Sequence, residues 1–168
     1  MMVGAGDRVL TFEQFFREEF PRLVPMLHAV CGDRQRAEDL AQDALAAAQR
    51  NWERIAGYDK PGAWVRRVAL NASSNTRRRQ RRESAGLRRV GVGEPVTESG
   101  SSDETLWRLV RRLPEQQRWA VALHYVEDRS VADIAEVLHC SQGAVKTHLS
   151  RARATLARQL GQPTQEAS

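Results

Sequence analysis

The apolar residues of this chain recur at intervals of three and four, which is the spacing of one helical face. Residues 130–157 show this most clearly, because two short apolar stripes meet there at a break over residues 139–141. Ser130 with Asp133 forms a capping box before the first stripe, and Ser141 can cap the second helix through its hydroxyl. The pattern predicts a helix-turn-helix, with these residues inward: Val131, Ile134, Ala135, Leu138, Val145, Leu149, Ala152 and Leu156.

The second of these helices has a polar outer face. Lys146, Thr147, Ser150 and Arg151 lie opposite the apolar stripe, with Gly143 on the same outer side. Hydrogen-bond donors, small residues and positive charge suit entry into a DNA major groove. A basic helix face can also simply be solvated, so this face is a candidate DNA-reading surface that needs a second argument.

The N-terminal part of the chain continues the helical spacing. Thr11 and Gln14 form a capping box before a Phe-rich helix, whose aromatic stripe we interpret as core. Pro21 suits the first position of a second helix, and Pro25 predicts a kink or a later start there.

After Asp33 we expect a long helix that turns its Ala and Leu residues inward and Asp39, Gln42 and Asp43 outward. This acidic face is either solvated or a docking surface for a helical partner. Residues 57–62 predict a loop, and Pro61 can open the next helix, which leads into an arginine run at 77–82.

Residues 83–102 lose the periodicity and gather Gly, Ser and Pro, as a flexible linker does. We therefore predict an all-α fold of two small helical domains, 11–82 and 103–160, the second ending in the helix-turn-helix. A linker of this length averages about 25 Å end to end. Two weak DNA-binding modules on such a tether raise each other's local concentration.

Charge is concentrated in one stretch. Residues 66–89 hold nine arginines and one acidic residue, Glu83, so this stretch carries a charge of +8. Because the whole chain has a net charge of +5, the rest of the chain is acidic. Such a basic segment indicates an anionic polymer as partner. Asn71 and Asn75, one turn apart on the same helix, could hydrogen-bond exposed base edges while the arginines hold phosphates.

Other classes of function find little support. Cys31 and Cys140 lack metal-ligand spacing, and Asp39 with Asp43 lacks a third acidic ligand. The sequence contains no nucleophile with a paired base, no glycine-rich phosphate loop, no apolar run that could span a membrane and no signal peptide. We expect a cytoplasmic, non-enzymatic protein without cofactors or metals.

Four segments together carry a resemblance to a known family. They are AEDLAQDAL (37–45), AWVRRVALNASSNTRRRQRR (63–82), LPEQQRWAVAL (113–123) and the helix-turn-helix. In this order they resemble the extracytoplasmic-function sigma factors, the minimal two-domain class of bacterial transcription initiation factors. The resemblance covers residues 11–160, and Asn75 with the run NASSNTRRRQRR (71–82) is similar to one actinobacterial branch.

The resemblance implies a role for each surface. The helix after Asp33 would dock on the clamp helices of the largest subunit of RNA polymerase through Asp39, Leu40, Gln42 and Asp43. The melted downstream (minus-ten) promoter element would contact Tyr58, Lys60, Arg66, Asn71, Asn75, Arg78 and Arg79. The upstream (minus-thirty-five) element would contact His124, Gln142, Gly143, Lys146, Thr147, Ser150 and Arg151. His124 departs from the family, which often has a phosphate-binding Arg there.

The resemblance also implies the partners: core RNA polymerase, through the clamp helices and the flap of the second-largest subunit, and promoter DNA. An anti-sigma protein is a further candidate partner. The alternative interpretation is a stand-alone helix-turn-helix regulator, which would have no use for the AEDLAQDAL helix.

Overall fold

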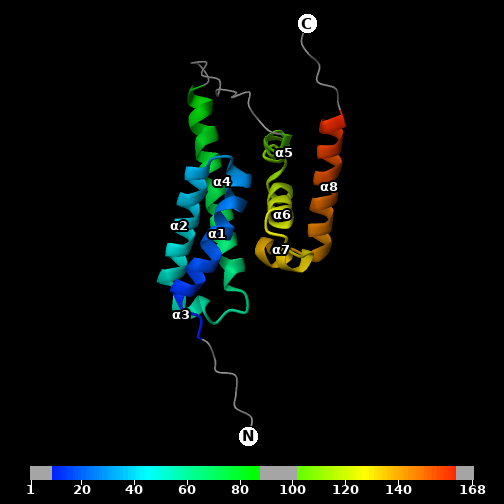
Figure 1. Cartoon of the computed structure of the whole chain (residues 1–168). Coiled ribbons are helices and arrows are strands. Elements are labelled where there is room, and N and C mark those ends of the chain that lie inside the picture. Colours follow the sequence, from blue (N-terminus) through cyan, green and yellow to red (C-terminus); the bar gives the residue numbers. More distant parts are fainter. Residues whose placement is uncertain (1–8, 88–101, 162–168) are drawn as a thin grey trace.

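The computed structural model describes residues 9–87 and 102–161, and every regular element in these ranges is an α-helix (Figure 1). The all-α prediction is confirmed. We call α1–α4 the N-terminal bundle: α1 (Phe12–Cys31), α2 (Arg34–Arg50), α3 (Trp52–Ile55) and α4 (Pro61–Leu87). We call α5–α8 the C-terminal bundle: α5 (Ser102–Val110), α6 (Glu115–Tyr125), α7 (Val131–Leu138) and α8 (Gln142–Gly161).

The predicted capping box starts α1. The backbone N–H of Gln14 donates to Thr11 Oγ1 at 3.3 Å, and the Thr11 N–H donates to Gln14 Oε1 at 3.2 Å. The helix ends at Gly32, where φ is +79°, a left-handed conformation that favours glycine. These two local signals set both ends of the helix.

The prediction that a second helix begins at Pro21 is wrong, because α1 continues through Pro21 and Pro25. Both prolines lie on the exposed side of the helix, while its apolar stripe, including Leu23 and Leu27, is buried without interruption. Packing of that stripe outweighs the loss of the backbone N–H donors.

The predicted linker starts too early. Helix α4 runs to Leu87, so residues 83–87 are helical, and an ion pair one turn apart, Arg79 to Glu83 at 3.5 Å, supports its last turns. Residues 88–101, which hold the rest of the predicted linker and two of its arginines, lie outside the described residues, as do the predicted leader at 1–8 and residues 162–168.

The two bundles lie against each other, with α6 on α1 and α7 on α4, and their buried apolar residues form one continuous cluster. The expectation of two loosely strung bodies therefore needs correction. Figure 1 shows α8 at the edge of the C-terminal bundle that faces away from the N-terminal bundle. None of the described helices combines the length and apolarity that crossing a membrane requires.

Candidate nucleic-acid and polymerase interfaces

The helix-turn-helix forms as its sequence predicts. The Asp133 N–H donates to Ser130 Oγ at 3.1 Å at the start of α7, and the Ala144 N–H donates to Ser141 Oγ at 3.0 Å at the start of α8. His139 adopts φ +53° in the turn between them. Of the predicted inward stripe, Ile134, Ala135, Val145, Leu149 and Ala152 are buried. Val131, Leu138 and Leu156 are only partly buried, and Val137, which the predicted stripe did not include, is buried beside them.

The outer face of α8 is exposed along its first three turns. Thr147 Oγ1 donates to the carbonyl of Gly143 at 3.0 Å, so its lone pairs remain available as acceptors. A Cβ at Gly143 would meet only Ser141 Oγ, at 3.8 Å, so the surface is open there. This face has the donors and the access that base-edge contacts require, through Gln142, Gly143, Lys146, Thr147, Ser150 and Arg151.

His124 is placed differently from these residues. Its ring is half-buried, with Nδ1 3.2 Å from the Arg129 carbonyl and its plane edge-on to Tyr125. Beside it, Arg153 Nε donates to the Tyr125 hydroxyl at 2.7 Å, and both side chains are exposed. No sequence pattern indicates the contact between Arg153 and Tyr125, because the two residues are 28 positions apart in the chain.

The exposed side of α4 carries the two amides. Asn71 and Asn75 lie one turn apart and face solvent, as do Arg78 and Arg79 further along the helix. Of the loop ahead of α4, Tyr58 is 40% exposed. These side chains could reach a nucleic-acid strand passing along α4.

Arg66 is not on that surface, and its assignment as an exposed DNA contact is wrong for this arrangement of the bundles. Its side chain is 0% exposed. Nε and Nη2 donate to the two carboxylate oxygens of Glu127 at 2.6 and 2.9 Å, and Nη1 lies 2.6 Å from Glu19 Oε2 and donates to the Gly62 carbonyl. Burial tends to lower the pKa of this guanidinium, but Glu127 and Glu19 raise it overall.

The sequence contains one signal for this cluster. Glu19 falls four residues after Phe15 and four before Leu23, on the buried stripe of α1, and a charge at such a position predicts a buried partner. Glu127 gives no local signal, because it is 61 residues from Arg66 along the chain.

Lys60 also contacts the C-terminal bundle. Its Nζ donates to Asp133 Oδ1 at 2.9 Å and to Glu136 Oε1 at 3.0 Å, and these hydrogen bonds raise the Lys60 pKa. The hydrogen bond from Lys60 likewise holds the pKa of Asp133 below its usual range.

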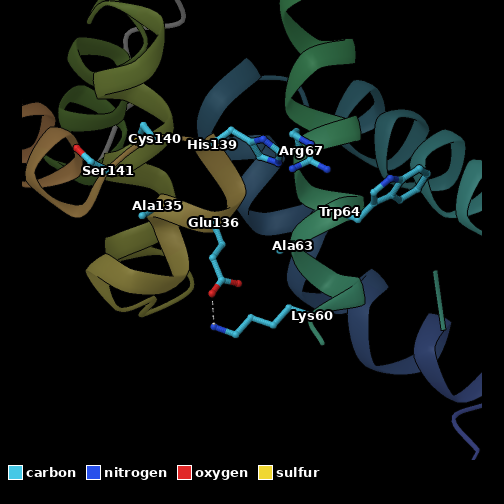
Figure 2. Close-up of a pocket in the computed structure, with 9 residues that line it drawn as sticks. All are labelled: Lys60, Ala63, Trp64, Arg67, Ala135, Glu136, His139, Cys140 and Ser141. Carbon is cyan, nitrogen blue, oxygen red and sulfur yellow. Dashed lines mark hydrogen bonds and ion pairs between the residues drawn. The ribbon is translucent and has the colours of Figure 1, made fainter. Parts of the chain in front are cut away.

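A cleft of about 610 Å³ lies beside this contact, between α4 and the α7 turn. Figure 2 shows Lys60 reaching toward Glu136, and Arg67 from α4 beside His139. Both bundles therefore contribute to the lining of this cleft, which combines the cations of Lys60 and Arg67, the carboxylate of Glu136 and apolar side chains such as Trp64.

On α2, Asp39, Gln42 and Asp43 are exposed, and Gln35 Nε2 donates to Asp39 Oδ1 at 3.2 Å. Leu40 is 6% exposed and packs in the core, so it cannot contact a partner directly, and its assignment as a contact residue is wrong. The reason is geometric: Leu40 follows Ala37 by three residues and therefore shares its inward face. The three exposed polar residues, Asp39, Gln42 and Asp43, remain the predicted docking face.

No three His, Cys, Asp or Glu side chains in residues 9–87 and 102–161 converge as a metal site would require.

Comparisons with known proteins match one family domain to each bundle. The sequence model of Sigma-70 region 2 matches residues 15–83, and that of Sigma-70, region 4 matches residues 103–156. The chain is 34% identical to the ECF RNA polymerase sigma factor SigM of Mycobacterium tuberculosis, over 94% of this chain and 80% of the relative. It is 30% identical to the RNA polymerase sigma-E factor of Streptomyces coelicolor, over 90% and 87%.

Among solved structures, the fold is similar to that of the sigma factor RpoE from Bartonella quintana, solved in complex with the anti-sigma factor NepR. The TM-score is 0.71 at 24% identity, covering 89% of this chain and 96% of that one. At this identity the likeness concerns the fold.

Proposed function

The chain belongs to the extracytoplasmic-function sigma factors of RNA polymerase, and from that premise we propose how its surfaces divide the work of promoter recognition. The protein directs core polymerase to specific promoters and initiates transcription there. It acts by binding, with no catalytic step of its own, and works in the cytoplasm beside the polymerase. The two functional domains are residues 11–82 and 103–160.

The upstream promoter element is read by α8 in the major groove. The exposed polar face of this helix supports the assignment: Lys146 and Arg151 are positioned for guanine edges or phosphates, and Thr147 and Ser150 for smaller contacts. Gln142 and Gly143 lie at the helix N-terminus, where backbone N–H groups favour a phosphate. His124, held by the Arg129 carbonyl, contributes at most a neighbouring phosphate contact.

The melted downstream element is held by the exposed side of α4 and the loop before it. Asn71 and Asn75 hydrogen-bond unstacked bases, Tyr58 offers a stacking surface, and Arg78 and Arg79 hold phosphates. Lys60 joins this surface once its carboxylate partners are removed. Trapping opened bases stabilises a melted state that the polymerase then uses.

The polymerase docks on the outer face of α2. Asp39, Gln42 and Asp43 offer one basic partner two carboxylates and an amide on a rigid helix. The C-terminal bundle meets the flap of the second-largest subunit. An anti-sigma factor, the partner in the solved relative, is a third candidate partner for this chain.

The observation that carries the proposal is the pairing of an exposed reading helix with a second, acidic docking helix in one chain. Run-off transcription with core polymerase on a promoter library tests it. We expect transcripts from a subset of promoters only when the protein is present. A stand-alone helix-turn-helix regulator would instead bind duplex DNA, fail to co-elute with core polymerase and produce no transcript.

A further inference from the structure

Several polar contacts join the two bundles directly. Arg66 meets Glu127, Lys60 meets Asp133 and Glu136, and Ser74 donates to Glu115. In the first two contacts the N-terminal bundle supplies the cation and the C-terminal bundle the carboxylate. We call Glu127, Asp133 and Glu136 the acidic clasp.

The Arg66 contact is the buried half of the clasp. Glu127 is 4% exposed and Arg66 0%, and the two hydrogen bonds between them run in parallel from the guanidinium fork to both carboxylate oxygens. Arg129 Nε adds a third donor to Glu127 at 3.2 Å. A buried guanidinium with two carboxylates is well satisfied, whereas removing one carboxylate leaves a charge that favours exposure to water.

The Lys60 contact is the exposed half. Two carboxylates approach one ammonium at 2.9 and 3.0 Å, as two phosphate oxygens of a DNA strand would. Lys60 is a proposed contact of the downstream element, and while the clasp is closed its Nζ is engaged by protein carboxylates. The clasp thus competes with DNA for the same cation.

The closed arrangement affects the two DNA surfaces unequally. Helix α7, which carries Asp133 and Glu136, packs on α4, the helix proposed to hold the melted strand. The reading face of α8 remains exposed, and Figure 1 places α8 on the far side of its bundle. Closure therefore engages two cations at the start of α4, Lys60 and Arg66, while Asn71, Asn75 and the reading face of α8 stay exposed.

We propose that the acidic clasp is an intramolecular stand-in for DNA phosphate that closes the free protein, so that Lys60 and Arg66 become available to a DNA strand only when the bundles separate. The proposal rests on the proposed function, since it assigns these cations to promoter DNA. Separation frees Lys60 and leaves Arg66 with Glu19 as its carboxylate partner, so the positive charge at the start of α4 increases.

The test compares two variants of the full chain that lose the same charge one residue apart. Glu127→Gln removes one carboxylate from the clasp while keeping the side-chain shape. Asp128→Asn is the matched control, because Asp128 is exposed and its φ of +53° is one that Asn tolerates. A double variant, Asp133→Asn and Glu136→Gln, tests the exposed half of the clasp. A second double variant, Asp103→Asn and Asp128→Asn, is its charge-matched control.

Closure is measured first, without DNA. Spin labels at Gln49 on α2 and Arg158 on α8, with Cys31 and Cys140 replaced by serine, report the distance between bundles. We expect one narrow distance distribution in the parent protein and in Asp128→Asn, and longer, broader distributions in Glu127→Gln and in the clasp pair. Equal distributions in Glu127→Gln and Asp128→Asn, or a broad distribution in the parent protein, overturn the clasp.

Strand binding is measured second, with a fluorescein-labelled single-stranded DNA of random sequence. Because opening shifts a mostly closed population, Glu127→Gln should bind this DNA on the order of tenfold more tightly than Asp128→Asn does. A random-sequence duplex, which α8 can reach in either state, should bind both variants alike. Longer distances without tighter strand binding would show that the clasp does not compete with DNA for these cations, and would overturn the proposal. Run-off transcription by the parent protein with core polymerase checks the proposed function separately.

Discussion

At the scale of single residues, the buried ion cluster leaves no room for a side chain at Gly62. A Cβ at this position would lie 2.8 Å from Arg66 Nη1 and 3.0 Å from Glu19 Oε1. The Arg66 guanidinium cannot move aside easily, because Glu127 holds its opposite edge through two hydrogen bonds.

We therefore expect Gly62→Ala to lower the free energy of unfolding by about 1–3 kcal/mol, the usual cost of overpacking a filled site. Gly86→Ala is the control in the same helix, since nothing lies within 4 Å of its added Cβ. That variant should gain no more than about 0.5 kcal/mol from helix propensity, because Gly86 is the second-last residue of α4. Urea unfolding followed by circular dichroism measures both, and equal effects of the two substitutions would contradict the packing argument.

At the scale of elements, α8 carries the most specific prediction about DNA. Lys146→Ala and Arg151→Ala should each weaken binding of the upstream element by about 1–3 kcal/mol if the side chain contacts a base. Arg158→Ala, on an exposed position nearer the end of α8, should change binding little beyond its charge. Fluorescence anisotropy on matched and scrambled duplexes separates the cases, because a phosphate contact weakens binding to both sequences alike.

Helix α2 carries the corresponding prediction about polymerase. Asp39→Arg reverses a charge at the centre of the proposed docking face, so it should abolish co-elution with core polymerase. Glu18→Arg makes the same change on the exposed side of α1 and should leave co-elution intact. Normal co-elution of Asp39→Arg would show that the polymerase docks elsewhere.

At the scale of the whole molecule, the two halves of the clasp should respond differently to solution conditions. Lys60 has a pKa raised above 10.5, chiefly by its hydrogen bond to Asp133, and Asp133 has a pKa lowered below 3.8, chiefly by its hydrogen bond from Lys60. A lowered carboxyl pKa stabilises the contact above 3.8, and a raised amine pKa stabilises it below 10.5. Between these values the Lys60–Asp133 contact should not depend on pH.

Salt is the effective variable instead, because the Lys60 and Asp133 side chains are 46% and 34% exposed. Screening at about 1 M salt should weaken this contact, while the buried Arg66–Glu127 pair is screened much less. We expect the interbundle distance of the parent protein to stay unchanged at high salt and that of Glu127→Gln to lengthen further. The same spin-label distances measure this, and opening of the parent protein by salt alone would show that the buried half contributes little.

The features that could be predicted from the sequence depend on residues that are close together in the chain. The caps at Thr11, Ser130 and Ser141 and the left-handed end of α1 at Gly32 follow from hydrogen bonds and dihedral preferences within four residues. The outer face of α8 follows in the same way, since helical spacing alone puts Lys146 opposite Val145 and Leu149. Pro21 is the exception, because packing of the apolar stripe outweighed its local preference.

Which charged side chains are paired and buried depends on the fold and could not be predicted from the sequence. Nothing near Arg66 in the sequence separates it from Arg78, yet one is buried in an ion cluster and the other faces solvent. The difference comes from Glu127 and Glu19, which the fold brings to Arg66 from distant parts of the chain. Charged groups interact according to their distance in space. Here that distance depends on the packing of α7 on α4, which no short segment of the sequence indicates.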